Sequence, residues 1–228
     1  MRSRHLFVTG TDTEVGKTFI SSALLRMARQ RGLHCIGLKP IAAGCHLENG
    51  EWRNDDALEL IAAASSQLDY AAINPVALEP PIAPHIALAQ TGQRVGAAEL
   101  ARLCRAHAHE GADLVLYEGA GGWLVPLNDG ETLADACVAL DAEVLLVVGM
   151  KLGCLNHALL TAAAIENAGL TLVGWVANCV GEAMPFLDEN VATLRSRLAA
   201  PCLGTVPYLP EGGPAAAGNH LDLDLLLK

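Results

Sequence analysis

Short apolar runs alternate with longer amphipathic segments along most of the chain. The apolar runs are typical of buried strands and lie at 5–8, 35–38, 114–117, 143–148, 172–177 and 202–206. The amphipathic segments predict helices at 17–31, 55–64, 97–109, 156–168 and 185–199. This alternation predicts an α/β fold, with a mostly parallel, twisted sheet and helices on both of its faces. Ligands bind such sheets at the carboxyl ends of the strands.

Two segments do not follow the alternating pattern. Residues 65–95 contain four prolines, which predict an irregular connection, at positions 75, 80, 81 and 84. Residues 212–218, GGPAAAG, predict a flexible loop before a short final apolar run. The 228 residues include no linker-like stretch, so we expect one domain over residues 1–228.

Composition and charge exclude several classes of protein. The net charge of −10 and the aromatic content of 4% argue against a nucleic-acid partner, which needs a basic surface and stacking side chains. The most apolar stretch, 144–150, is too short to cross a bilayer, and the N-terminal apolar run is too short for a signal peptide. Seven scattered cysteines without a Cys-x-x-Cys pair indicate a reduced, cytoplasmic protein without a structural zinc site.

The first strand is followed by the sequence GTDTEVGKT, which has the features of a phosphate-binding loop. Glycines let backbone N–H groups point toward phosphate oxygens, and the following helix adds the positive end of its dipole. Lys17 would lie between the terminal phosphates of a nucleotide, and the Thr18 hydroxyl would coordinate Mg²⁺. Five residues separate Gly10 from Gly16, one more than usual. The alternative is an ordinary strand-to-helix turn with a surface lysine.

Acidic residues near other strand ends are candidate Mg²⁺ ligands, since this ion prefers oxygen donors. Glu118 follows a buried strand and precedes Gly-Ala-Gly-Gly, which would let backbone approach a ligand. Asp55 or Asp56 would supply a further carboxylate. The alternatives are a solvated carboxylate for Glu118, and an N-cap with a first-turn acid for the aspartates.

Three further side chains have both a functional and an ordinary interpretation. Lys39 ends a strand, where its charge would stabilise a transferred phosphoryl group, or it is a surface lysine. Asn178 would match the adenine edge, or it forms a turn. Cys154 has no His and Asn partners in the pattern, which favours a small buried residue.

The chain resembles the dethiobiotin synthetases over most of its length. The resemblance rests on an ordered set of motifs: VTGTDTEVGKT (8–18), KPIAAG (39–44), RNDDAL (53–58), NPVALEPPIAPHIA (74–87), EGAGGW (118–123), VVGMKLGCLNHALLT (147–161), GLTLVGWVAN (169–178) and VPYLP (206–210). It implies a single-domain phosphate-loop fold, in which the phosphate loop is one residue longer than usual, as it is between Gly10 and Gly16. It also implies a cytoplasmic enzyme that uses MgATP to join CO₂ to 7,8-diaminononanoate, through a carbamate and a carbamic–phosphoric anhydride that closes to dethiobiotin.

The resemblance also implies roles for individual residues. The catalytic residues would be Lys39 and Lys17, and the Mg²⁺ ligands would be Thr18, Asp56 and Glu118. The ATP-binding residues would be Glu14, Val15, Gly16, Lys17, Thr18, Asp56, Glu118, Gly119, Ala120, Gly121, Asn178, Cys179, Pro207, Tyr208 and Leu209. The substrate-binding residues would be Thr13, Lys39, Ala43, Gly121, Gly153, Cys154 and Asn156. Gly153, Cys154 and Asn156 would reach the substrate carboxylate of the other subunit in a homodimer.

One residue departs from the family pattern, and two rival classes remain. Ala43 stands where the family usually has serine, which removes one hydroxyl from the substrate site. Glu211 is a candidate ribose contact in a segment that aligns poorly. A partition-type ATPase would usually carry an extra lysine early in its phosphate loop, and positions 11–15 have none. An amide ligase of the cobyrinate type would need a glutamine-hydrolysing domain, which 228 residues do not accommodate.

Overall fold

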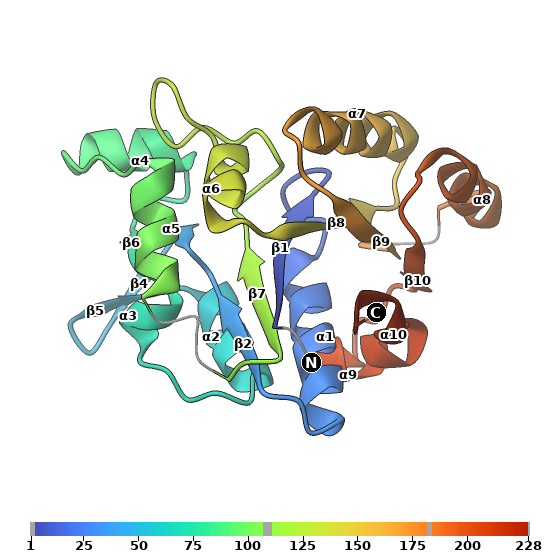
Figure 1. The fold of residues 1–228 in the computed structure, drawn as a ribbon, viewed down its shortest axis with the longest axis horizontal. Helices are drawn as coiled ribbons and strands as arrows, with labels where there is room; N and C mark the ends of the chain where they lie inside the picture. The colour runs from blue at the N-terminus through green and yellow to red at the C-terminus, as the bar shows by residue number, and fades with distance from the viewer. Residues whose placement is uncertain (1–2, 107–110, 182–183, 228) are drawn as a thin grey trace.

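The computed structural model, which describes residues 3–106, 111–181 and 184–227, contains a six-stranded sheet (Figure 1). The strand order is β10-β9-β8-β1-β7-β2, and every pair is parallel. The strand bounds are β1 Arg4–Gly10, β2 Cys35–Leu38, β7 Leu114–Glu118, β8 Glu143–Gly149, β9 Leu172–Asn178 and β10 Cys202–Val206. The predicted strands and the parallel sheet are therefore confirmed, although several strands extend one or two residues further than expected.

Helices cover both faces of this sheet. Their bounds are α1 Lys17–Gln30, α2 Asp55–Ala63, α5 Ala97–Arg105, α6 Leu133–Leu140, α7 Cys154–Asn167 and α8 Leu187–Arg197. Alternate strand residues point to opposite faces, so Leu145 and Val147 pack with the α1 side, whereas Leu146 and Val148 pack with α7 and α8. The central strands β1, β7 and β8 are buried on both sides over most of their length, which explains why they appear in the sequence as continuous apolar runs.

The helix predictions are confirmed for five segments, with shifts at their ends. The helix expected at 97–109 ends at Arg105, and the expected end at position 109 lies outside the described residues. Helix α6 was not expected from the apolar pattern, although its start carries a capping box in which the Thr132 and Asp135 side chains and backbones satisfy one another. A Thr-x-x-Asp signal in the sequence marks that start.

The expectation of an irregular connection over 65–95 is wrong. This segment forms α3 (Tyr70–Ile73), β6 (Val76–Leu78) and α4 (Pro84–Gln90). Strand β6 pairs with β3 (Ile41–Ala43) in a separate two-stranded parallel sheet, and an antiparallel hairpin of β4 (His46–Glu48) and β5 (Glu51–Arg53) follows β3. Pairing with a strand more than thirty residues away stabilises β6, and no local pattern signals it. The prolines bound these short elements, with Pro84 in the first turn of α4.

The expectation of a flexible loop over 212–218 is also wrong. Residues Gly213–Ala217 form α9, followed by the 3₁₀ helix η1 (Gly218–His220) and by α10 (Asp224–Leu227). Helix α9 lies against α1, with Ala217 fully buried in the same core cluster (Figure 1). Three alanines after Pro214 have good helix propensity, and the tertiary contact with α1 stabilises a helix this short. Among the described residues, no helix has the length and apolar character needed to cross a membrane.

Candidate active site

The phosphate loop connects β1 to α1 through two residues in left-handed conformations. Glu14 has φ of 58° and Gly16 has φ of 84°. A Cβ atom at Gly16 would lie 2.2 Å from Asn178 Nδ2, so only glycine fits this position. Strained backbone of this kind, held by its surroundings at the start of a helix, is typical of an anion-binding loop.

Neighbouring strands hold the loop in place. Asn178 at the end of β9 donates from Nδ2 to the Val15 carbonyl at 2.9 Å, and its side chain is buried. The Thr11 N–H donates to the Val147 carbonyl at 3.0 Å, and an exposed salt bridge of 2.9 Å joins Lys151 to Asp12. The loop is therefore fixed before any ligand binds.

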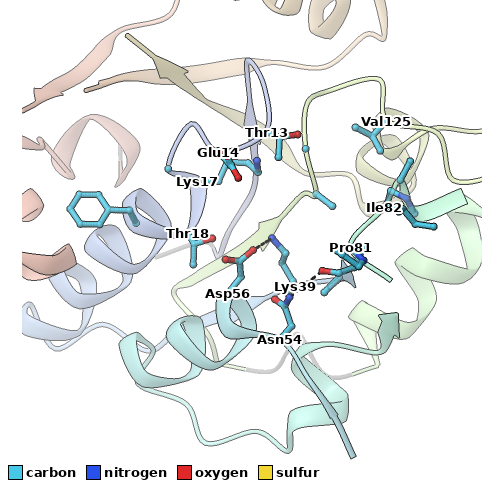
Figure 2. Close-up of a pocket in the computed structure, with 18 residues that line it drawn as sticks. Thr13, Glu14, Lys17, Thr18, Lys39, Asn54, Asp56, Pro81, Ile82 and Val125 are labelled. Atoms are coloured by element: carbon cyan, nitrogen blue, oxygen red, sulfur yellow. Dashed lines mark hydrogen bonds and ion pairs between the residues drawn. The ribbon is translucent and has the colours of Figure 1, made fainter. Parts of the chain in front are cut away.

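A buried lysine and two carboxylates meet beside the loop, and Figure 2 shows the Lys39 side chain pointing to one of them, Asp56. Lys39 Nζ lies 2.7 Å from Asp56 Oδ2 and 2.7 Å from Glu118 Oε1. Thr18 Oγ1 donates to the same Glu118 oxygen at 2.7 Å. Lys39 is 3% exposed and Glu118 is fully buried, so this ion pair lies in a region of low dielectric constant. The structure thus brings together side chains from α1, β7, α2 and the residue after β2.

The two lysines of the site have opposite pKa shifts. Burial, assisted by the nearby Lys39 charge, lowers the pKa of Lys17 to about 8. Burial also acts to lower the pKa of Lys39, but the Glu118 and Asp56 carboxylates outweigh it and raise that pKa. Burial acts to raise the pKa of Asp56, but the Lys39 charge and hydrogen bond hold it below its usual value. Lys39 and Asp56 are therefore charged at neutral pH.

The residues present fit a Mg²⁺ ion. Glu118 Oε2 is buried and has no hydrogen-bond partner, which leaves an anionic oxygen for a cation. Asp56 faces the same region, whereas the Asp55 side chain is 91% exposed and lies only near His46, so the geometry favours Asp56 of the two. The described part of the chain has no cluster of three or more His, Cys, Asp or Glu residues. Phosphate oxygens and water would therefore complete the ligand set of Mg²⁺.

A cavity of about 860 Å³ opens between the phosphate loop and the segment before α4 (Figure 2). Predicted site residues that line it are Thr13, Glu14, Gly16, Lys17, Thr18, Lys39, Ala43, Asp56, Ala120 and Gly121. One wall is apolar, with Pro81, Ile82 and Val125 facing the polar groups across the cavity. A cavity of this size holds a small ligand with both charged and apolar parts.

Other predicted site residues lie outside this lining. The Val15 side chain is buried next to Gly10 and Gly149, so only its backbone could contact a ligand. The remaining predicted residues outside the lining are Glu118, Gly119, Gly153, Cys154, Asn156, Asn178, Cys179, Pro207, Tyr208 and Leu209. Glu118 touches the site through Thr18 and Lys39. Asn178 is the last residue of β9, and the others lie after β7, β8, β9 and β10, at the carboxyl edge of the sheet.

Sequence reasoning did not assign several residues that line the cavity. They are Phe19, Ala42, Asn54, Pro81, Ile82, Ala83, Pro84 and Val125. For Asn54 a signal was present, because an asparagine before two aspartates is a typical N-cap, and its side chain accepts a bond from the Ala57 N–H. Pro81 and Ile82 in the apolar wall had no local signal, since they follow β6, whose position depends on its pairing with β3.

Together, the parallel sheet, the loop before α1 and the lysine between two acids define a phosphate-loop nucleotide-binding protein. The family model described as "AAA domain" matches residues 4–216. A protein of Cellvibrio japonicus (strain Ueda107) named ATP-dependent dethiobiotin synthetase BioD is 53% identical over 227 residues, covering 100% of this chain and 99% of that protein. A Pseudomonas aeruginosa (strain UCBPP-PA14) protein of the same name is 52% identical and covers 95% of each chain.

The chain belongs to the family of ATP-dependent dethiobiotin synthetases.

Its fold is also similar to more distant solved structures. A ParA family ATPase from Chlorobium tepidum TLS has a TM-score of 0.57 at 13% identity, covering 100% of this chain and 99% of that one. The MinC:MinD cell division protein complex of Aquifex aeolicus has a TM-score of 0.61 at 15% identity, covering 98% and 94%. At these identities the likeness concerns the fold alone.

Proposed function

We propose that this protein forms dethiobiotin from 7,8-diaminononanoate, CO₂ and ATP as an ATP-dependent ligase of biotin biosynthesis. The observation that carries the proposal is the cavity where the phosphate-loop residues Lys17 and Thr18 meet Lys39 and Asp56, opposite an apolar wall. Full-length identity of 53% to an ATP-dependent dethiobiotin synthetase supports the same activity. The polar side suits a nucleotide and a carbamate, and the apolar side suits an aliphatic chain.

In the proposed reaction, one substrate amine adds to CO₂ and loses a proton, giving a carbamate. The carbamate oxygen takes the γ-phosphoryl group of ATP and ADP leaves. The second amine then attacks the carbamoyl carbon, the C–O bond to phosphate breaks, and the cyclic urea closes. Phosphate is a far better leaving group than a carbamate oxygen, which explains the need for ATP. Both amines belong to one molecule, so ring closure is effectively unimolecular.

Each residue of the site has a part in this proposal. Lys17 and the N–H groups of residues 14–18 bind the phosphates, and Lys39 stabilises charge on the transferred phosphoryl group. Thr18, Asp56 and Glu118 would hold Mg²⁺, which would neutralise phosphate charge when bound. Thr13, Ala43 and the backbone of residues 119–122 border the diamine. Asn178, Cys179 and residues 207–209 border adenine, and Glu211 borders the ribose.

We further propose a homodimer with the substrate carboxylate bound across the interface. Gly153, Cys154 and Asn156 at the start of α7 do not line the cavity of their own chain, as expected if they serve the other subunit. Leu152 beside them is 95% exposed, and Leu160 on α7 is 62% exposed. A monomeric mass by light scattering at micromolar concentration would contradict this arrangement.

We also propose a cytoplasmic location, because all seven cysteines are free thiols, which suits the reducing cytoplasm.

The test of the function is product formation by the purified protein. The assay supplies MgATP, bicarbonate and 7,8-diaminononanoate together, and parallel assays omit each of them in turn. The products measured are ADP and dethiobiotin. We expect product only when all three are present. ATP hydrolysis that is indifferent to the diamine would instead point to a switch ATPase.

Ala43 gives a prediction about affinity for the diamine. Ala43 ends β3 and lines the cavity, so Ala43→Ser would add a hydroxyl to the substrate site. One neutral hydrogen bond contributes about 0.5–1.5 kcal/mol, so we expect the KM for the diamine to fall about 2- to 10-fold with kcat little changed. Steady-state kinetics at saturating MgATP measure this. An unchanged KM would mean that the substrate does not reach this position.

The lowered pKa of Lys17 predicts that nucleotide binding is linked to protonation. Above a pH of about 8 the free protein holds Lys17 largely neutral, whereas bound phosphates favour its ammonium form. Binding of MgATP should therefore take up a proton at pH 8.5, and the affinity should fall as the pH rises further. Calorimetric titration in two buffers of different ionisation enthalpy counts the protons. If the Lys17→Met variant takes up as many protons on binding MgATP, another group is responsible for the uptake.

A further inference from the structure

Three residues outside the reacting groups, Asn74, Tyr70 and Asn54, connect Lys39 to the helix that carries Asp56 through hydrogen bonds. This series of hydrogen bonds begins at Asn74, whose Nδ2 donates to the Lys39 carbonyl at 2.7 Å and to the Val76 carbonyl at 3.3 Å. The Tyr70 hydroxyl donates to Asn74 Oδ1 at 3.0 Å and accepts the Asn54 N–H at 2.7 Å. Asn54 in turn caps α2, where Asp56 lies in the first turn.

Both backbone groups of Lys39 are held by this one segment. The Lys39 N–H donates to the Ile73 carbonyl at 2.8 Å, and the Lys39 carbonyl accepts from Asn74. Asn74 is 3% exposed and Asn54 is 8% exposed, so water competes little for these bonds. The Arg53 guanidinium lies 4.1 Å from the centre of the Tyr70 ring and fixes its orientation.

We infer that Tyr70 and Asn74 are positioning residues for the active-site lysine, setting where the Lys39 ammonium lies relative to Asp56 and Glu118. Lys39 follows β2, whereas Asp56 belongs to α2, and their side chains nevertheless meet at 2.7 Å. The Asn74–Tyr70–Asn54 chain of hydrogen bonds is a direct polar link between these two elements. Its loss would let the ammonium move relative to the phosphoryl group that it serves, and small displacements of this kind cost much of the rate.

This inference rests on the proposed function for its kinetic part but has a separate chemical readout. Tyr70→Phe removes the hydroxyl and keeps the ring under Arg53. The control is Tyr117→Phe, because Tyr117 is a buried tyrosine whose hydroxyl bonds His5 at 2.9 Å instead. The chemical readout is the acetylation rate of Lys39 by an amine-reactive ester, measured by peptide mass spectrometry. Exposed Lys151 in the same sample is the reference.

We expect Tyr70→Phe to lower kcat at least 10-fold with the KM for ATP within 2-fold, and to raise Lys39 acetylation at least 5-fold relative to Lys151. Tyr117→Phe should change neither. If the two variants behave alike in both readouts, the role is purely structural and the inference is overturned. Should Tyr70→Phe fail to fold, Asn74→Ala removes the hydrogen bond to the Lys39 carbonyl instead. The same two measurements are then made on that variant. A wild-type protein that makes no dethiobiotin would refute the function, while the acetylation ratio still decides the positioning.

Discussion

Replacing Lys39 with methionine is expected to lower kcat for dethiobiotin formation by about 10²- to 10³-fold, with the Kd for MgATP changed much less. A buried charge aimed at the group that gains charge in the transition state typically contributes this much to the rate. Lys39 Nζ is held at 2.7 Å from two carboxylates, so its position is fixed before substrate arrives. Single-turnover phosphoryl transfer and equilibrium nucleotide binding, measured on the same preparation, separate the two quantities.

The stability of the Lys39→Met variant needs its own control. Removing the ammonium leaves the fully buried Glu118 without its counter-ion, and breaking a buried pair in this way costs about 3–5 kcal/mol of unfolding free energy. Lys39→Met with Glu118→Gln removes both charges and should recover much of that stability without recovering turnover. Equal losses of ATP affinity and of turnover in the single variant would show that Lys39 is an ordinary nucleotide ligand.

Replacing Lys17 with methionine is expected to reduce kcat/KM by about 10³-fold, because the variant loses the charge beside the terminal phosphates. The same variant should make the free protein more stable. Burial lowers the pKa of Lys17 from 10.5 to about 8, which corresponds to an unfavourable contribution of about 3 kcal/mol at neutral pH. A methionine of similar length avoids this cost. Denaturant unfolding and steady-state kinetics measure the two effects.

The dependence of unfolding on pH distinguishes this explanation from a general packing effect. The unfolded state keeps Lys17 protonated up to a pH near 10.5, whereas the folded state releases the proton near 8. The cost is therefore full below pH 8 and is relieved as the pH rises from 8 to 10.5. The stability advantage of Lys17→Met should shrink over that window. A constant advantage at all these pH values would contradict the assignment.

The sequence was sufficient to predict which side chains meet at the carboxyl edge of the sheet. Lys39 and Glu118 each belong to a strand end, and parallel strands bring such ends together whatever the intervening chain does. The same reasoning could not find Asn74 or Tyr70. Their partners are backbone groups of Lys39 and Asn54, and the segment that places them looks irregular in the sequence because its prolines hide two short helices and a strand.

The choice between Asp55 and Asp56 shows a second limit of sequence reasoning. Both residues lie in the first turn of α2, so local pattern treats them alike. The direction of the helix axis decides which one faces Lys39, and that direction depends on the packing of α2 against α1 and β2. Helix α6 was missed for a different reason. Its capping signal was present, but its eight residues are almost all apolar and show no amphipathic period.

The position of β1 in the middle of the sheet determines when this protein can fold during its synthesis. Arg4 pairs in register with Leu114, and Leu6 pairs with Glu143, so the first strand has no sheet neighbour until about half of the chain has been made, and its second neighbour follows later. Until then its fully buried residues, Leu6 and Val8, are exposed to water. The phosphate loop needs contacts from Val147 and Asn178 and forms later still. A nascent chain stalled before residue 114 would therefore hold an unpaired apolar strand, which is a site for chaperone binding or aggregation.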